Sequence, residues 1–295
     1  MLLKENSSFR DNKTSVFHFK NKILRRIDIK ENLDFKKFLE SNFYRKNAGK
    51  IVKTKILNEN EKKEYNIVGD NNFEWLEHEK IEKLIYPYEQ TFDQLKASAT
   101  LFLDLYIDAI KNSYDIIDAS AFNIQFNNSD PIFIDLGSFI ELKKESKINW
   151  YKQFCENYLA PLLIKSKVKI NFNDIYKGDI EGVNLKLASK ILPLSSWFNF
   201  GILINIHLQS YLNSRISSST TKKIKSKKIL SAKQKILVAS NLKKMILKLK
   251  SSKKSYWSNY SKINSYNDKT LNKKKELVSN FVKKEKIISL MDLGC

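Results

Sequence analysis

The chain has 295 residues, of which 42% are hydrophobic and 12% aromatic, so it has enough apolar side chains for one large or two ordinary domains and too many for a disordered protein. Its net charge is +21, carried almost entirely by lysine. The two cysteines, Cys155 and Cys295, have no metal-ligand or redox spacing, and neither a signal peptide nor a run of about 20 apolar residues is present. These features predict a soluble cytoplasmic protein with no membrane partner.

The first part of the chain is predicted to be β-rich. Two apolar runs around Lys20-Asn21-Lys22 predict a β-hairpin over residues 17–27, and residues 32–46 then predict a short helix. Further strands are expected at residues 50–57, 74–76 and 83–86, with a charged, turn-rich span between the first two.

The middle of the chain is predicted to be mostly helical. Apolar residues at helical spacing predict an amphipathic helix over 91–112, and residues 150–212 also show mainly helical patterns. Between them, residues 116–140 predict two short strands joined by a polar turn. We therefore expect a β-rich small lobe over 1–88 and a helical lobe over 89–213.

The lysines are concentrated after Tyr211. Residues 214–230 predict a basic linker, and residues 231–295 predict two helices, over 231–250 and 268–284, followed by a strand. Nucleic acid is a conceivable partner for so basic a segment, but arginine, the better reader of bases and phosphates, is scarce, so we do not favour it. We expect the 231–250 helix to pack through its apolar face, with its lysines in solvent, rather than to bind a membrane.

Three residues have the spacing of kinase catalytic and metal-binding loops. Asp118 is followed five residues later by Asn123, and Asp135 begins an Asp-x-Gly turn twelve residues after that. Phosphoryl transfer needs a carboxylate at the acceptor hydroxyl and oxygen ligands for Mg²⁺ between the phosphates. Asp118 is predicted to take the first role, and Asn123 and Asp135 the second. The alternative is that Asp118 and Asn123 cap turns while Asp135 ends a strand.

The upstream part of a kinase site is less complete. No glycine lies between Asp11 and Lys20, where a phosphate loop is expected, and no Val-Ala-Ile-Lys strand is present. Arg25 occupies the place of the phosphate-pairing lysine, and Glu40 is its candidate partner. ATP and Mg²⁺ are the cofactors that this site would take.

The last residues predict a nucleotide-binding turn of a second kind. The apolar run at 287–291 leads into Asp292-Leu293-Gly294, which is typical of the end of the first strand in a nucleotide-binding α/β sheet. An ordinary terminal strand is the alternative. We expect the chain to be the front portion of a longer protein.

Several segments in order along the chain resemble a group of bacterial class I SAM-dependent methyltransferases, some of which carry a nodulation-protein label. These segments are Phe9-Arg10-Asp11, Tyr86-Pro87-Tyr88-Glu89, residues 118–126 and 131–135, residues 150–155, Leu159-Ala160-Pro161-Leu162 and residues 187–193. The resemblance implies a long N-terminal region before a Rossmann-like methyltransferase domain. It implies SAM as cofactor, with Asp292 and Gly294 at the start of its site, and a methyl acceptor that is an unknown small molecule or macromolecule.

The sequence predicts an α+β protein with a kinase-like two-lobe region that leads into a truncated Rossmann-like domain. Three functions stay open. The chain is the N-terminal part of a SAM-dependent methyltransferase, inactive alone because most of the SAM site is missing; or it is an ATP- and Mg²⁺-dependent phosphotransferase; or it is a catalytically silent kinase-like module that binds a substrate. Zinc is not expected because His18, His78 and His207 share no motif, and Cys155 is expected to be buried and inert.

Overall fold

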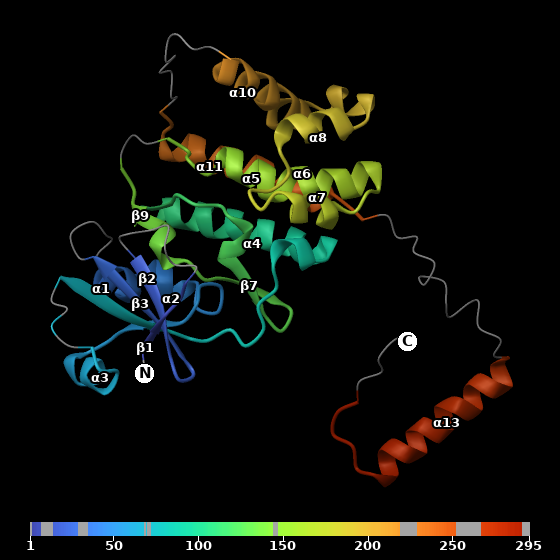
Figure 1. Cartoon of the computed structure of the whole chain (residues 1–295). Coiled ribbons are helices and arrows are strands. Elements are labelled where there is room, and N and C mark those ends of the chain that lie inside the picture. The colour runs from blue at the N-terminus through green and yellow to red at the C-terminus, as the bar shows by residue number, and fades with distance from the viewer. Residues whose placement is uncertain are drawn as a thin grey trace. The chain divides into compact units, whose positions relative to one another are not determined.

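The computed structural model describes residues 2–6, 14–28, 35–67, 69, 72–143, 147–218, 229–251 and 267–290. The chain forms two compact units, Met1–Ser251 and Ser252–Cys295. The first unit combines a five-stranded sheet with a larger helical region, so the chain belongs to the α+β class (Figure 1).

The sheet is antiparallel, with strand order β1-β2-β3-β5-β4. Its strands are β1 Leu2–Lys4, β2 Thr14–Phe19, β3 Lys22–Asp28, β4 Thr54–Ile56 and β5 Phe73–His78. The predicted hairpin is confirmed as β2 and β3, which pair from Thr14↔Ile27 to Phe19↔Lys22. Lys20, in the turn, has φ of 49°, a left-handed value that is common in tight hairpin turns.

The two faces of the sheet carry different residues because side chains alternate along each strand. Arg25 and His78 lie on the face toward the main core, together with Ile27 and Leu76. Leu24 lies on the opposite face, within a small second core formed by Phe19, Leu24, Leu57, Tyr65, Ile67 and Trp75. The sheet is thus covered on both sides, and only one side faces the helical region.

The small helices of this lobe differ from the sequence prediction. The single helix expected over 32–46 is two helices, α1 Phe35–Glu40 and α2 Asn42–Lys46, because Ser41 is extended and its hydroxyl accepts the Tyr44 N–H as an N-cap. The charged span contains a helix that was not predicted, α3 Glu59–Glu64, which begins with a capping box between Asn58 and Glu61. The strand predicted at 83–86 is wrong, because that segment is irregular and joins β5 to the helical region.

The helical region begins with α4 Phe92–Lys111, which confirms the amphipathic helix predicted over 91–112. Short antiparallel pairs follow, β6 Tyr114–Ile116 with β9 Phe139–Glu141 and β7 Ile124–Asn127 with β8 Asp130–Phe133. The remaining elements are η1 Pro87–Glu89, η2 Ala121–Asn123, η3 Leu136–Ser138, α5 Tyr151–Phe154, η4 Cys155–Leu159, α6 Ala160–Leu163, η5 Ile164–Val168, α7 Phe172–Gly178, α8 Leu185–Ile191, η6 Leu194–Phe198, α9 Phe200–Ile202, η7 Leu203–Leu208 and α10 Gln209–Ser218.

The basic helix α11, Ala232–Lys248, packs against α4 within the first unit. Ala239, Leu242 and Ile246 are buried in the main core, so the prediction of a packed helix is confirmed. One lysine departs from the predicted solvent-exposed face: Lys235 is 1% exposed and its Nζ donates to Asp115 Oδ2 at 2.5 Å. Within the described residues, none of the helices combines the length and the apolar character needed to cross a membrane.

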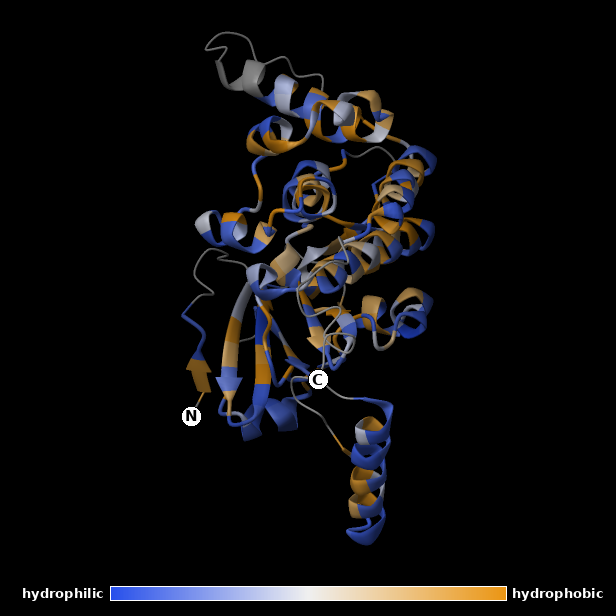
Figure 2. Ribbon diagram, turned by 90° about the vertical axis from the view of Figure 1, so that its right-hand side faces the viewer, coloured by the Kyte–Doolittle hydropathy of each residue, from blue (hydrophilic) through white to orange (hydrophobic). Residues whose placement is uncertain are grey.

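The second unit contains α13, Asp268–Lys284, which confirms the helix predicted over 268–284. It is mostly hydrophilic, with a few hydrophobic residues interspersed along it, as Figure 2 shows by colour. Residues 287–290 form no strand, so that part of the predicted terminal strand is wrong. Asp292 and Gly294, the predicted SAM-binding residues, lie outside the described residues, as does most of the predicted linker.

Candidate functional site

A cavity of about 630 Å³ lies where the sheet meets the connecting segment and the β7–β8 hairpin. From the sheet it is lined by Val16, Ile23, Arg25 and His78, from the connecting segment by residues 79–82, 84 and 86, and from the hairpin region by Phe122, Gln125 and Ile134. Its size is within the ordinary range for small-molecule sites, and its walls combine apolar side chains with a few polar ones.

An ion pair joins the two lobes at this cavity. Arg25, on β3, donates from Nη1 to Asp135 Oδ1 at 2.6 Å, although the two residues are 110 positions apart in the chain. The other carboxylate oxygen accepts the hydroxyl of Ser138 at 2.5 Å, and the Gly137 N–H also donates to Asp135. The sequence predicted both residues of the pair for the site, and the structure brings them into direct contact.

These contacts keep Asp135 ionised. Burial alone would raise the pKa of its carboxyl, but the positive charge of Arg25 and the hydrogen bonds from Ser138 and Gly137 outweigh burial and hold the pKa below its usual value. Asp135 is not among the residues that line the cavity, but its ionised carboxylate is bound to Arg25, which does line it, and such a carboxylate is suited to a metal ion.

The loop before the hairpin holds the other two predicted residues. Asp118 Oδ1 accepts the Ser120 N–H at 2.8 Å, and the Asn123 carbonyl accepts the Ile134 N–H at 2.8 Å, which places Asn123 beside the start of the Asp135 turn. The backbone of the loop is bound by side chains of the following helices, since Gln153, Asn157 and Tyr158 accept from or donate to residues 119–121. The loop that carries Asp118 is therefore rigidly supported.

The positions of Asp118 and Asn123 fit both a turn-capping role and a functional role. Asp118 caps the Ser120 turn, as the alternative interpretation predicted. Asn123 has a buried Nδ2 atom without a hydrogen-bond partner in the described part of the chain. Nδ2 is an N–H donor, so it can bind an acceptor atom but not a cation, for which only the amide oxygen of Asn123 is suitable.

Glu40 does not pair with Arg25. It is exposed at the end of α1, where it borders a shallow surface pocket with Lys36 and Lys37, and the partner of Arg25 is Asp135 instead. Glu40 is the last residue of α1, which ends at the N-cap Ser41.

Two site residues were not predicted. Gln125 accepts the Ile85 N–H through Oε1 at 2.9 Å and so ties the connecting segment to the hairpin. His78 ends β5, is 6% exposed and lines the cavity. In the sequence, Gln125 stands out only as a single polar residue between apolar neighbours in a short strand. For His78 the signal was a position on the same face as Arg25, which only the strand register reveals.

No metal site built from protein side chains alone is present in the part of the chain that the structure describes, if three or more His, Cys, Asp or Glu side chains are required. Mg²⁺ in nucleotide sites needs less, because one or two protein oxygen ligands are completed by phosphates and water. Asp135 and Asn123 supply such oxygen atoms, and the ionised state of Asp135 suits a divalent cation.

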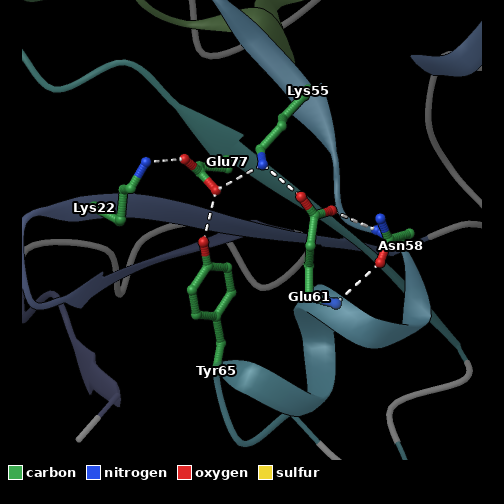
Figure 3. Close-up of polar contacts among 6 residues, drawn as sticks. All are labelled: Lys22, Lys55, Asn58, Glu61, Tyr65 and Glu77. Atoms are coloured by element: carbon green, nitrogen blue, oxygen red, sulfur yellow. Dashed lines mark hydrogen bonds and ion pairs between the residues drawn. The ribbon is translucent and has the colours of Figure 1, made fainter.

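A second cluster of charged residues lies on the face of the sheet opposite Arg25, and its members are paired with one another. It consists of Lys22, Lys55, Asn58, Glu61, Tyr65 and Glu77 (Figure 3). Glu77 accepts from Lys22 at 2.5 Å and from Tyr65 at 2.8 Å, and burial together with this hydrogen bond raises the pKa of Tyr65 to about 12. The cluster ties α3 to the sheet and leaves no open group for a ligand.

We expect the first unit to lose stability as the pH falls from 7 to 5. Burial, reinforced by the charge of Arg25, lowers the pKa of His78 from 6.5 to about 3, and burial also lowers that of His207. In this window the unfolded chain binds protons that the folded chain does not, so stability is present above pH 6.5 and is lost below it. The loss is at most about 1.4 kcal/mol per pH unit for each histidine.

Urea denaturation at pH 7.5 and 5.0 measures this effect. The variant His78→Gln should show a smaller loss between the two pH values than the unmodified chain, since one of the two titrating groups is gone. Equal losses in both proteins would contradict the assignment to His78.

Comparison with known proteins gives one extensive sequence similarity. The chain is 31% identical over 294 residues to the nodulation protein NoeA of Rhizobium meliloti (strain 1021), which covers 98% of this chain and 61% of the relative. The chain therefore spans about three fifths of the length of this curated relative. No family model matches the chain. The predicted resemblance to a nodulation protein is confirmed. The predicted resemblance to methyltransferases stays a prediction.

Solved kinase structures are among the structural neighbours, with low scores. The kinase PK-1 of Cydia pomonella granulovirus has a TM-score of 0.35 at 12% identity, covering 51% of this chain and 58% of the kinase. Vaccinia related kinase 3 has a TM-score of 0.35 at 11% identity, covering 88% and 89%. WbdD, solved with the kinase inhibitor LY294002, has a TM-score of 0.32 at 11% identity, covering 82% and 45%. Likeness at this level carries no weight for the site, which rests on its own geometry.

Proposed function

We propose that the first unit binds a nucleoside triphosphate with Mg²⁺ in the cavity and transfers its terminal phosphoryl group. The observation that supports this most directly is the Arg25–Asp135 pair, in which a strand supplies a cation that lines the cavity and an Asp-x-Gly turn supplies the ionised carboxylate bound to that cation. Phosphoryl-transfer sites need both a cation for the phosphates and a carboxylate for the metal.

Each residue of the proposed site has a separate role. Asp135 and Asn123 are the ligands for Mg²⁺, which supplies charge neutralisation of the phosphates when bound. Arg25 exchanges its contact with Asp135 for the phosphate oxygens, to which a guanidinium can donate two parallel hydrogen bonds. This exchange leaves Asp135 free for the metal without leaving either charge unpaired.

Asp118 is the group that receives the proton of the acceptor. In the transfer step the hydroxyl oxygen of the acceptor bonds to the γ-phosphorus, and the bond between the γ-phosphorus and the β-bridging oxygen breaks. The hydroxyl proton passes to Asp118, and the nucleoside diphosphate leaves. The rigid support of the loop by Gln153 and Asn157 is the kind of preorganisation that such a step requires.

Thermal unfolding with and without Mg²⁺-ATP tests the binding. A ligand at 100 times its dissociation constant stabilises the folded chain by about 2.7 kcal/mol, so we expect a clear rise in Tm. Asp135→Asn should abolish the Mg²⁺-dependent part of this rise. Asp130→Asn is the matched control, because Asp130 is an exposed carboxylate at the start of β8, the strand that precedes Asp135.

Three outcomes bear on the proposal. If ATP at millimolar concentration with Mg²⁺ does not raise the Tm of the unmodified chain, the proposed function is wrong. If ATP binds and Asp118→Asn binds it equally well while phosphoryl transfer is lost, the role of Asp118 is supported. Equal binding without any transfer by the unmodified chain would favour the silent binding module.

We propose as a second candidate that this chain corresponds to the N-terminal part of a SAM-dependent methyltransferase. It is supported by the methyltransferase resemblance in the sequence and by the similarity to a nodulation protein of greater length. In the resemblance, Asp292 and Gly294 supply only the start of the SAM site. Calorimetric titration with SAM should therefore show no binding to the 295-residue chain and binding to the full-length relative, and failure of the relative to bind SAM would contradict the candidate.

A further inference from the structure

Another cavity, of about 700 Å³, lies in the helical region and shares no lining residue with the cavity of the proposed nucleotide site. Its walls come from α11 on one side and from α5, α6, η5, α9 and η7 on the other. All of these elements belong to the first unit. The volume is within the ordinary range for small-molecule sites, so this cavity is large enough for a ligand of its own.

The buried part of the cavity wall is apolar. Leu163, Ile202 and Leu242 line the cavity, are at most 3% exposed and belong to the main core. Val238 and Met245, which also line it, are partly buried and pack against the same core. A ligand with an apolar body would therefore remove both its own surface and this wall from water.

The charged residues of the cavity wall are all lysines. Lys167 of η5 and Lys244 and Lys248 of α11 line the cavity, are exposed, and have no ion pair or hydrogen bond to another residue that the structure describes. No Asp or Glu lines the cavity, and none occurs in the sequence between Gly182 and Asn267. The positive charge at this cavity therefore has no counterpart in its wall, and an anionic group is its complement.

Two π-helical turns contribute to the cavity wall. η5 supplies Lys167, and η7 supplies Ile204 and Asn205. Asn205 Oδ1 accepts the Tyr151 hydroxyl at 2.5 Å, and its Nδ2 donates to the Gly201 carbonyl at 2.7 Å, so η7 is tied to α5 and α9. Turns of this kind are rare and frequently lie at functional sites, so their presence on one cavity is a second reason, independent of charge, to assign it a ligand.

We propose that this cavity binds a monomeric amphiphilic anion. The apolar part of the ligand lies against the core side chains, and its carboxylate, sulfate or phosphate group lies among the three lysines. A cationic amphiphile would bury the same apolar surface but would be repelled by the lysines. A small anion without an apolar part would gain only contacts with exposed lysines, which are weak. The proposal does not depend on the nucleotide site.

Calorimetric titration of the 295-residue chain tests the ligand class, with each probe kept below the concentration at which it forms micelles. Decanoate should bind tighter than decyltrimethylammonium by roughly 5- to 50-fold, because the two differ in the sign of the head group. Decanoate should also bind tighter than octanoate by roughly 4- to 16-fold, because two further CH₂ groups are buried. Acetate should not bind measurably at the same concentrations.

Two variants test the place of binding, each with a matched control. Lys244→Gln/Lys248→Gln should weaken decanoate roughly 3- to 10-fold. Lys233→Gln/Lys250→Gln, which removes the same charge from exposed positions that do not line the cavity, should leave decanoate binding unchanged.

Ile204→Trp adds bulk at a lining residue that is 38% exposed, and it should weaken decanoate at least 10-fold by filling the cavity. Leu237→Trp is its control, because Leu237 is 60% exposed and does not line the cavity. Circular dichroism shows whether each variant is folded at the temperature of the titration.

Three results would overturn the proposal. The first is equal affinity for decanoate and decyltrimethylammonium, and the second is an equal effect of the two lysine double variants. The third is binding to vesicles of phosphatidylglycerol without binding to monomeric decanoate, which would indicate a membrane surface rather than a cavity ligand. Decanoate binding that is selective for the anion, sensitive to chain length and lost in Ile204→Trp would support the cavity.

Discussion

Replacing Lys235 by methionine should destabilise the first unit by about 3–5 kcal/mol, since removal of one partner of a buried ion pair leaves the other charge uncompensated. Lys235 and Asp115 have side chains that are 1% and 5% exposed, and they connect α11 to β6 across 120 positions of sequence. Methionine preserves most of the side-chain length but cannot donate to the Asp115 carboxylate. For a unit of this size the change corresponds to a fall in Tm of about 6–20 °C.

The control for this prediction lies on the same helix. Lys243 pairs with Asp104, but these side chains are 30% and 40% exposed, so Lys243→Met should change stability by no more than about 1 kcal/mol. The double variant Asp115→Ala/Lys235→Met should recover part of the loss, because neither charge remains buried. A loss in Lys235→Met no greater than that in Lys243→Met would show that the buried pair does not hold α11 in place.

Replacing Trp150 by alanine should destabilise the first unit by about 3–5 kcal/mol through the cavity that it leaves. Trp150 is fully buried and packs edge-on against Phe102 and Tyr106 of α4, with ring centroids 5.2 and 4.6 Å away, and against Phe154 of α5 at 5.6 Å. These contacts join α4 to the helices that support the Asp118 loop. Thermal unfolding monitored by circular dichroism measures the effect.

An exposed aromatic residue provides the comparison for Trp150. Phe198 is 91% exposed, and Phe198→Ala should change stability by less than about 0.5 kcal/mol. If the two variants unfold at the same temperature, the aromatic cluster around Trp150 is not part of the stabilising core. If only Trp150→Ala is destabilised and it also loses Mg²⁺-ATP binding at a temperature where it is still folded, the cluster positions the site as well.

Most of the local structure could be predicted because its causes are local. The hairpin of β2 and β3, the helix α4 and the helix α11 each follow from apolar periodicity within a few turns or a few residues, together with caps such as Thr91 and Ser231. The errors had local causes too. Ser41 divides one expected helix into two, and Asn58 begins a helix within a span that reads as a turn.

The candidate site could be predicted only as a set of residues. The spacing of Asp118, Asn123 and Asp135 indicated phosphoryl-transfer chemistry, and strand position indicated Arg25, but the sequence pointed to Glu40 as the partner of Arg25. The true partner, Asp135, is 110 residues away, and a contact at that separation depends on how the lobes pack rather than on any pattern within a segment.

By itself, therefore, the sequence determined the α+β class and the order of the main elements, and it supplied the residues of the proposed phosphate and metal site. The tertiary structure decided which charges meet. It paired Arg25 with Asp135, buried Lys235 against Asp115 although its helix predicted a solvent-exposed lysine, and placed His78 in the wall of a cavity. The physical reason is that periodicity and capping act between near neighbours, whereas burial and charge pairing depend on segments that meet only in the folded chain.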